Sequence, residues 1–301
     1  MRLTNKVVAK NQQVKRHLER QETEKLWTRY FKGNAFILFE LAAGLKIKLY
    51  RTSKLTEYIL FHEFEKAEVG FFERYLQQGD FVLDIGANIG FHTIHASNII
   101  GKEGRVFAFE PVLDTFNHLK ENIAINQMSN VIPANIGFSD KNEAAKINVS
   151  VNYNAWNTLA KRERMEKHEA GKFDATETIQ LKKLDDWILL KTFGVEKISL
   201  VKIDVEGWEK YVILGGLNYF SKYAPAVMME LSDGNAFAAG YQCSEVYEMF
   251  NSLGYEWFRL ADAGKKIIPF PKQISFFSEN LIAVKRNSKP YERLIGQWKI
   301  A

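Results

Sequence analysis

The stretch VKIDVEGWE near the middle of the chain holds four ionisable side chains within eight residues: Lys202, Asp204, Glu206 and Glu209. Lys202, Asp204 and Glu206 alternate with apolar residues, so they would point to one side of a strand. Glu230 ends a second apolar run, APAVMMEL. Acids gathered in this way can hold a hydroxyl group and take its proton while its oxygen attacks an electrophile. We predict catalytic roles for Lys202, Asp204, Glu206 and Glu230, with Asp204 as the base or as a clamp on the acceptor.

A structural explanation of the same residues stays open. Glu206 could cap the helix that follows, and Lys202 could pair with Asp204 only to balance its charge. The three acids Asp204, Glu206 and Glu230 could also hold Mg²⁺. Their spacing is not diagnostic of a metal site, so we predict no metal ligand and leave magnesium as an unsupported possibility.

Two histidines stand near the glycine-rich stretch DIGANIG. His92 and His95 are three residues apart in a predicted helix and therefore share a face. We expect them to pack in the helix or to form a buried hydrogen bond in preference to taking part in catalysis.

The stretch DIGANIG itself lies between an apolar run and a helical pattern. Open α/β sheets bind ligands at this position, where glycines allow close approach and the helix N-terminus offers free N–H groups. Glu110 ends the next apolar run, RVFAFE, where a carboxylate can hold a ribose diol. We therefore predict a nucleotide-type cofactor at this loop.

The residue types in the loop favour S-adenosylmethionine over NAD. A dinucleotide fingerprint requires glycine where Asn88 and Phe91 stand, and no phosphate-binding G-x-x-x-x-G-K-[ST] stretch occurs. Asp84 ends the strand before the loop and would repel a pyrophosphate, but it suits a ligand that carries an ammonium and a sulfonium. An NAD-binding oxidoreductase stays as an alternative, and so does a non-catalytic interaction protein.

Elements that alternate along the chain must position these residues. Apolar runs separated by helical patterns predict βαβ units and a doubly wound, mostly parallel sheet with right-handed crossovers. The expected strands are 81–85, 105–110, 130–138, 198–204 and 224–231, with 255–260 and 280–286 as a closing pair; the expected helices are 90–100, 114–126, 208–216 and 244–254.

Three further segments stand outside this rhythm. Residues 5–31 are predicted to form a helix, residues 36–50 a β-hairpin, and residues 63–77 another helix. Residues 139–183 interrupt the alternation with a short antiparallel excursion and a charged stretch at 161–172. That interruption is either a solvated loop or a lid over the substrate.

The stretches VLDIGANIGFHT, GRVFAFEP, LKENIAIN and VKIDVEGWEKYVILGG together resemble the FkbM family of S-adenosylmethionine-dependent methyltransferases. The resemblance covers about residues 60–285, and D-x-G-A-N-x-G and K-x-D-V-E-G are its most specific parts. It implies a class I, Rossmann-like methyltransferase with a seven-stranded sheet whose last strand is antiparallel. It also implies methyl transfer to a hydroxyl oxygen, often on a sugar or a secondary metabolite.

Roles for the cofactor residues follow from the resemblance. Gly86, Asn88 and Gly90 are expected to line the cofactor, Asp84 to lie near its methionine amine and Glu110 to hold the ribose. Ser139 and Asp140, after the third strand, are the candidates for the adenine edge. Methylation of a nitrogen or of nucleic acid stays as an alternative, although no N-P-P-Y-like tetrapeptide follows the fourth strand.

Composition sets the remaining expectations. The length of 301 residues allows one large domain with an extension. We expect residues 1–60 to form an N-terminal helix and hairpin extension and residues 61–301 to form the catalytic domain, with residues 139–183 as an insertion. Residues 1–32 hold nine Lys/Arg and three Glu, so their net charge is +6. The remaining residues carry −1, which gives the whole chain +5. A single cysteine and no long apolar run favour a soluble, cytoplasmic protein. We expect a small-molecule or carbohydrate acceptor and no nucleic-acid partner, and a homodimer stays open.

Overall fold

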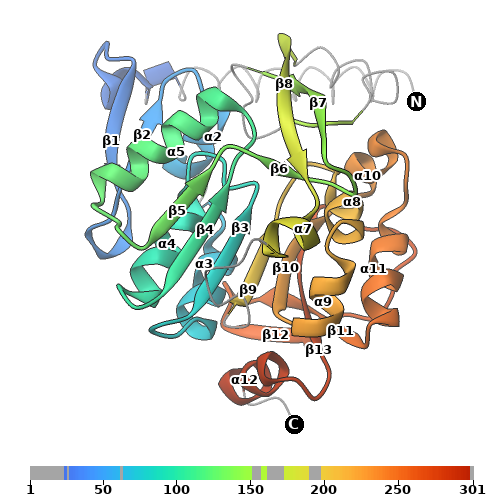
Figure 1. Cartoon of the computed structure of the whole chain (residues 1–301). Coiled ribbons are helices and arrows are strands. Elements are labelled where there is room, and N and C mark those ends of the chain that lie inside the picture. The colour runs from blue at the N-terminus through green and yellow to red at the C-terminus, as the bar shows by residue number, and fades with distance from the viewer. Residues whose placement is uncertain are drawn as a thin grey trace, which may run out of the picture.

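The computed structural model describes residues 24–25, 27–61, 64–150, 157–160, 173–189 and 198–298. Within these residues eight strands form one twisted sheet in the order β12-β11-β13-β10-β9-β3-β4-β5 (Figure 1). The five parallel strands are β3 (Phe81–Ile85), β4 (Arg105–Phe109), β5 (Val131–Ala134), β9 (Ile198–Ile203) and β10 (Ala226–Leu231). Neighbouring strands in this group run parallel, as predicted from the alternating pattern.

The closing strands are β11 (Tyr255–Ala261) and β13 (Glu279–Lys285). Strand β13 pairs antiparallel with both β10 and β11, so the predicted antiparallel last strand is confirmed. The expected count of seven strands was wrong, because β12 (Lys266–Pro269) adds an eighth at the edge through an antiparallel pairing with β11. This strand is only four residues long and ends in proline, which an edge position tolerates, so no sequence pattern marked it.

Helices cover both faces of the sheet (Figure 1). One face packs against α3, α4, α5 and α12 through residues such as Val82, Val106 and Leu200. The other face packs against α7, α8, α9 and α11 through Leu83 and Phe107, which alternate with the first set. The bounds are α3 Lys66–Tyr75, α4 Phe91–Ile100, α5 Leu113–Ile125, α7 Leu184–Leu189, α8 Glu209–Leu214, α9 Leu217–Tyr223, α10 Asp233–Ala239, α11 Cys243–Ser252 and α12 Lys289–Trp298.

The apolar run 130–138 does not form one strand. It divides into β5 in the main sheet and β6 (Gly137–Phe138), which pairs with β8 (Ala175–Lys182) in a separate sheet of order β6-β8-β7. Strand β7 (Glu143–Val149) pairs antiparallel with β8, so the predicted antiparallel excursion is confirmed. The charged stretch 161–172 lies outside the described residues.

The N-terminal hairpin pairs β1 (Phe36–Glu40) with β2 (Lys46–Tyr50), as predicted. The backbone N–H of Lys48 donates to the side chain of Asn122 in α5, and that of Lys46 donates to Asn126 just after this helix, so the hairpin is fixed to the core. Residues 24–25 and 27–31 are helical, and the rest of the predicted helix 5–31 lies outside the described residues. Helix α2 (Lys54–Phe61) then leads into α3. Among the described residues no helix is both long and apolar enough to cross a membrane.

Candidate active site

A cavity of about 280 Å³ opens at the carboxyl ends of β3, β4, β9 and β10. Its wall combines residues from three separate parts of the chain. The main sheet and its loops supply polar groups that include Glu110, Asp204 and Glu230. Helix α2 supplies Leu55 and Tyr58, and the three-stranded sheet supplies Ile147, Ile179 and Leu181. The cavity is therefore acidic where the parallel strands end and apolar where the two added segments cover it.

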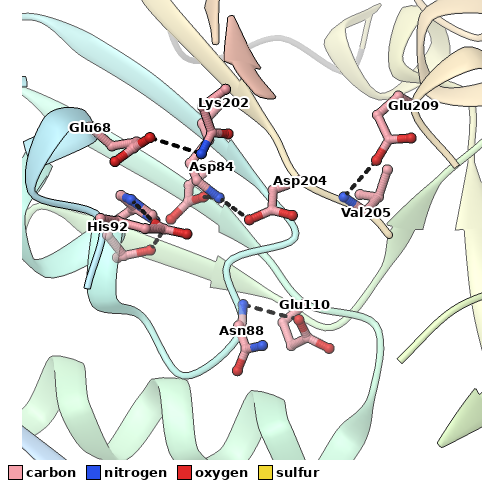
Figure 2. A network of polar contacts seen from close by, with 12 residues as sticks. Glu68, Asp84, Asn88, His92, Glu110, Lys202, Asp204, Val205 and Glu209 are labelled. Atoms are coloured by element: carbon pink, nitrogen blue, oxygen red, sulfur yellow. Dashed lines mark hydrogen bonds and ion pairs between the residues drawn. The ribbon is translucent and has the colours of Figure 1, made fainter. Parts of the chain in front are cut away.

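Glu110 forms a buried carboxylate at the end of β4, with 6% of its surface exposed. The backbone N–H groups of Asn88 and Val112 donate to it over 3.1 and 3.0 Å, and Figure 2 shows it facing Asn88. Burial raises the pKa of Glu110 to about 7, and the two backbone hydrogen bonds limit the rise. This carboxylate fits a ribose diol, because two hydroxyl donors at the cavity would stabilise its charged form.

The glycine-rich loop is held against the ends of two strands. The N–H groups of Gly86 and Ala87 both donate to the carbonyl of Phe109. Gly86 and Asn88 line the cavity and have positive φ angles of 84° and 49°. Gly90 begins α4 with a φ of 93° and does not belong to the described wall. Of the three predicted loop residues, the structure therefore brings Gly86 and Asn88 to the cavity.

Lys202 of β9 lies between Asp84 at the end of β3 and Asp204 just after β9 (Figure 2). Its Nζ lies 2.9 Å from Asp204 Oδ2 and 3.9 Å from Asp84 Oδ1. Burial alone would lower the pKa of Lys202, but Asp204 and Asp84 outweigh it and raise the pKa. Thr93 donates to Asp84 Oδ2 over 2.5 Å, while Asp84 Oδ1 is buried with no hydrogen-bond partner among the described residues. Asp84 is 2% exposed and does not belong to the described wall of the cavity, so the structure does not bring this predicted residue to the ligand surface.

Asp204, Glu206 and Glu230 come together at one side of the cavity, each with an oxygen within 4.8 Å of the others. Burial raises the pKa of Glu230 to about 8, and the charge of Asp204 adds to the rise. Burial and the charge of Asp204 also raise the pKa of Glu206 well above its usual range. Within the described chain these are the oxygens that could hold a divalent cation.

The turn after β9 is supported by Glu209, and not by Glu206. Glu209 accepts hydrogen bonds from the N–H groups of Val205 and Gly207, each over 3.2 Å, and from the Tyr241 hydroxyl over 2.9 Å. Glu206 instead accepts a 3.0 Å hydrogen bond from Asn235 and lines the cavity. Its carboxylate is therefore directed to the cavity, and the capping role considered for it falls to Glu209.

Ser139 and Asp140 lie behind the cavity. Ser139 is fully buried, and its hydroxyl accepts a 3.1 Å hydrogen bond from Trp208 Nε1 and donates to Asp140 over the same distance. The described wall next to them consists of Gly137 and Phe138. The structure therefore places apolar and backbone surface where the sequence suggested polar side chains.

Two residues of the wall, Glu65 and His92, were not predicted as site residues. Glu65 precedes α3 and His92 lies in the first turn of α4, so 27 positions separate them in the sequence. The only sequence signal was the place of His92 two residues after Gly90, at the start of the helix that follows the loop.

The strand order and the cavity at the carboxyl ends are those of the class I, Rossmann-like methyltransferase fold. The family profile described as "Methyltransferase FkbM domain" matches residues 84–257, and the chain belongs to this family. A profile for protein-L-isoaspartate(D-aspartate) O-methyltransferase also matches residues 1–148. S-adenosylmethionine is the cofactor, and when bound it supplies an electrophilic methyl group on a sulfonium. The family assignment leaves no place for the NAD-binding alternative.

Two curated relatives are similar over about half of the chain. Methyltransferase sdnD of Sordaria araneosa is 29% identical over 161 residues, which cover 46% of this chain and 61% of the relative. Hexuronic acid methyltransferase AglP of Haloferax volcanii is 29% identical over 142 residues, which cover 47% of this chain and 52% of the relative. The matches thus span between half and three fifths of those proteins.

Solved structures give more distant similarities. Methyltransferase FkbM from Methylobacillus flagellatus KT is 12% identical with a TM-score of 0.42, and the match covers 68% of this chain and 43% of that one. A SAM dependent methyltransferase from Aquifex aeolicus is 14% identical with a TM-score of 0.39, covering 76% and 94%.

Proposed function

We propose that the protein transfers a methyl group from S-adenosylmethionine to a hydroxyl oxygen of a sugar or a secondary metabolite. The supporting observation is the group of carboxyl side chains, Asp204, Glu206 and Glu230, at the cavity beside the cofactor loop. Such groups orient a hydroxyl by accepting its hydrogen bond, and orientation matters because the sulfonium is already activated. The similarity to a hexuronic acid methyltransferase is consistent with a carbohydrate acceptor.

On this proposal the cofactor occupies the side of the cavity formed by β3 and β4. Glu110 holds the ribose hydroxyls, and Gly86 and Asn88 contact the cofactor through their backbone. Asp84, which is buried beside Lys202 outside the described wall, attracts the methionine amine only by its charge. The wall beside Phe138 receives the adenine, with Ser139 and Asp140 supporting that wall from behind.

The acceptor occupies the remaining side. Asp204, held as a carboxylate by Lys202, clamps the acceptor hydroxyl by accepting its hydrogen bond. Glu230, whose pKa is raised to about 8, retains its proton near neutral pH and donates a hydrogen bond to a neighbouring oxygen of the acceptor, and Glu206, whose pKa is also raised, lies beside it. The apolar residues of β7 and β8 cover the acceptor, so these described strands within 139–183 act as a lid. Within residues 1–60, α2 completes the wall through Leu55 and Tyr58.

The test combines cofactor binding with product analysis. Titration calorimetry with S-adenosylhomocysteine, with NADH as control, should show binding of the homocysteine compound alone. The enzyme is then incubated with S-adenosylmethionine carrying a ¹³C methyl group and a matched panel of acceptors. The panel contains methyl α-D-glucopyranoside, its glucuronate and glucosamine counterparts, and a phenol.

Carbon NMR separates the possible products, because a methyl ether, a methyl ester and a methylamine have distinct methyl resonances. A methyl ether supports the proposal. A methylamine from the glucosamine derivative would favour the nitrogen alternative. A methyl ester from the glucuronate would replace hydroxyl methylation by carboxyl methylation. Binding of the homocysteine compound with no product from any acceptor would count against a sugar or phenol hydroxyl.

A further inference from the structure

His92 and Glu65 form a pair in the wall of the cavity. His92 Nε2 lies 2.6 Å from Glu65 Oε2. His92 is 6% exposed, and the two facing atoms are themselves buried. The two atoms are close, but their geometry is not that of a hydrogen bond. Neither atom has a hydrogen-bond partner among the described residues. A buried imidazole beside a carboxylate, with its hydrogen-bonding capacity unsatisfied at a cavity, is a feature that calls for a ligand.

The backbone holds Glu65 in place for this contact. Glu65 has a φ of 45°, in the left-handed region that a side chain rarely adopts, and it stands immediately before α3. The rings of Phe72 and Phe91 pack against the imidazole, with centroids 5.5 and 5.4 Å away. A non-glycine residue in this conformation next to a cavity is typical of a functional position. The pair is therefore fixed from both sides, by aromatic packing on His92 and by the turn at Glu65.

The charged and titratable groups that act on His92 come from three elements. Glu65 and Glu68 lie on the α3 side, His95 lies one turn further along α4, and Asp204 follows β9. Burial lowers the pKa of His95 to about 4, with His92 adding to the effect, so His95 is neutral near pH 7. The Lys202 ammonium also acts on Glu65, so the charged groups around the pair are of both signs.

The acids on the acceptor side of the cavity are poorly suited to take a proton. Burial raises the pKa of Asp204, but Lys202 outweighs this and lowers it, so the carboxylate is a weak base. The pKa of Glu230 is raised to about 8, so it already holds a proton near neutral pH, and the pKa of Glu206 is raised by burial and by the neighbouring carboxylates. Imidazole is the side chain whose ordinary chemistry suits proton transfer at that pH.

We propose that His92 is a catalytic residue that takes the proton of the acceptor hydroxyl, and that Glu65 is a positioning residue that stabilises the resulting imidazolium. This inference rests on the proposed methylation of a hydroxyl. The acceptor oxygen forms a bond to the methyl carbon as the methyl–sulfur bond breaks, and the hydroxyl proton passes to His92. The products are a methyl ether, S-adenosylhomocysteine and an imidazolium paired with the Glu65 carboxylate, which later releases its proton to solvent.

The experiment compares His92→Asn, Glu65→Gln and the matched control His95→Asn, which removes a buried histidine from the same helix but outside the described wall of the cavity. Each variant is checked for folding by thermal melting and for S-adenosylhomocysteine affinity by calorimetry. Turnover is measured on the panel acceptor that the wild type converts to a methyl ether. We expect His92→Asn to lower kcat at least about 100-fold while KM and cofactor affinity stay within about threefold. His95→Asn should keep kcat within about threefold.

Glu65→Gln gives a second test that does not depend on the folding of the His92 variant. Without the carboxylate the imidazolium formed in the step loses a negative charge 2.6 Å away, so kcat should fall at least about tenfold while KM and S-adenosylhomocysteine affinity stay within about threefold. Wild-type kcat in His92→Asn, loss of S-adenosylhomocysteine affinity in that variant, or unchanged kcat in Glu65→Gln would each overturn the proposal. Absence of any methyl ether with the wild type would instead count against the proposed function.

Discussion

A Cβ atom at Gly86 would lie 1.8 Å from the carbonyl oxygen of Asp204. The cofactor loop and the end of the catalytic strand are therefore in direct contact, with no room for a side chain between them. The N–H of Asp204 also donates to the carbonyl of Ile85, so the two segments are joined on both sides of this contact. The position of the glycine-rich loop therefore fixes the position of Asp204.

Gly86→Ala should destabilise the fold and abolish cofactor binding. The methyl group would collide with the Asp204 carbonyl, and alanine would be strained at a φ of 84°. Gly79→Ala is the matched control, because Gly79 has the same φ and nothing within 4 Å of the added Cβ. We expect about 1 kcal/mol of destabilisation for the control and at least about 2 kcal/mol more for Gly86→Ala in denaturant titrations. Equal losses in the two variants would contradict the close contact.

Glu110→Gln should weaken S-adenosylhomocysteine binding by about 1–3 kcal/mol, since charged acceptors bind hydroxyls more strongly than neutral ones. Because the pKa of Glu110 is raised to about 7, its carboxylate is protonated below that pH and ionised above it. The affinity of the wild type should therefore rise as pH increases through about 7, by up to about tenfold per pH unit on the acidic side. Calorimetry between pH 6 and 8 checks both statements, with the exposed Glu103→Gln as control. A flat profile in the wild type would remove the ribose assignment.

Asp204→Asn should separate binding from turnover. The amide keeps the shape of the side chain but gives up the ion pair with Lys202 and a charged hydrogen-bond acceptor for the hydroxyl. We expect kcat to fall at least about 100-fold while S-adenosylhomocysteine affinity stays within about threefold. The exposed Asp262→Asn serves as the control. Loss of cofactor binding in Asp204→Asn would move this residue to the cofactor side.

Removal of divalent cations should leave turnover within about twofold. The Lys202 ammonium already lies against Asp204, where it supplies the positive charge that a cation would bring. Dialysis of the enzyme against EDTA, followed by assays with and without added Mg²⁺, checks this expectation. A loss of turnover that only Mg²⁺ restores would show that the three acids bind a metal ion.

Local patterns predicted the parallel core of the fold because each central strand is a short, buried run with its own ending. The sequences FVLDI and RVFAFE became β3 and β4 with nearly the expected bounds. The division between β5 and β6 was not visible, because the apolar run continues through Ile136 while the backbone changes sheets. Which sheet a strand joins is decided by distant partners, here the pairing of Gly137 with Leu181.

The residues of the site also fall into a group that local patterns predicted and a group that they did not. Residues at strand ends, such as Glu110 and Glu230, were predicted because parallel strands bring their carboxyl ends to one edge. The Glu65–His92 pair was missed, since it depends on how α3 packs against α4. Ser139 was placed in the right region, but its buried hydroxyl accepts a hydrogen bond from Trp208 and does not reach the cavity.

The three-part wall of the cavity has a consequence for how acceptor preference can change. Apart from Gly137 and Phe138 of β6, the cofactor side is built from the main sheet and its loops, whereas the opposite side comes from α2 and from β7 and β8, which lie before and within that sheet in the sequence. Exchange of these two segments between relatives could therefore redirect the enzyme to another acceptor without rebuilding its cofactor pocket. Cofactor binding and acceptor choice are thus encoded largely in separate segments of the chain.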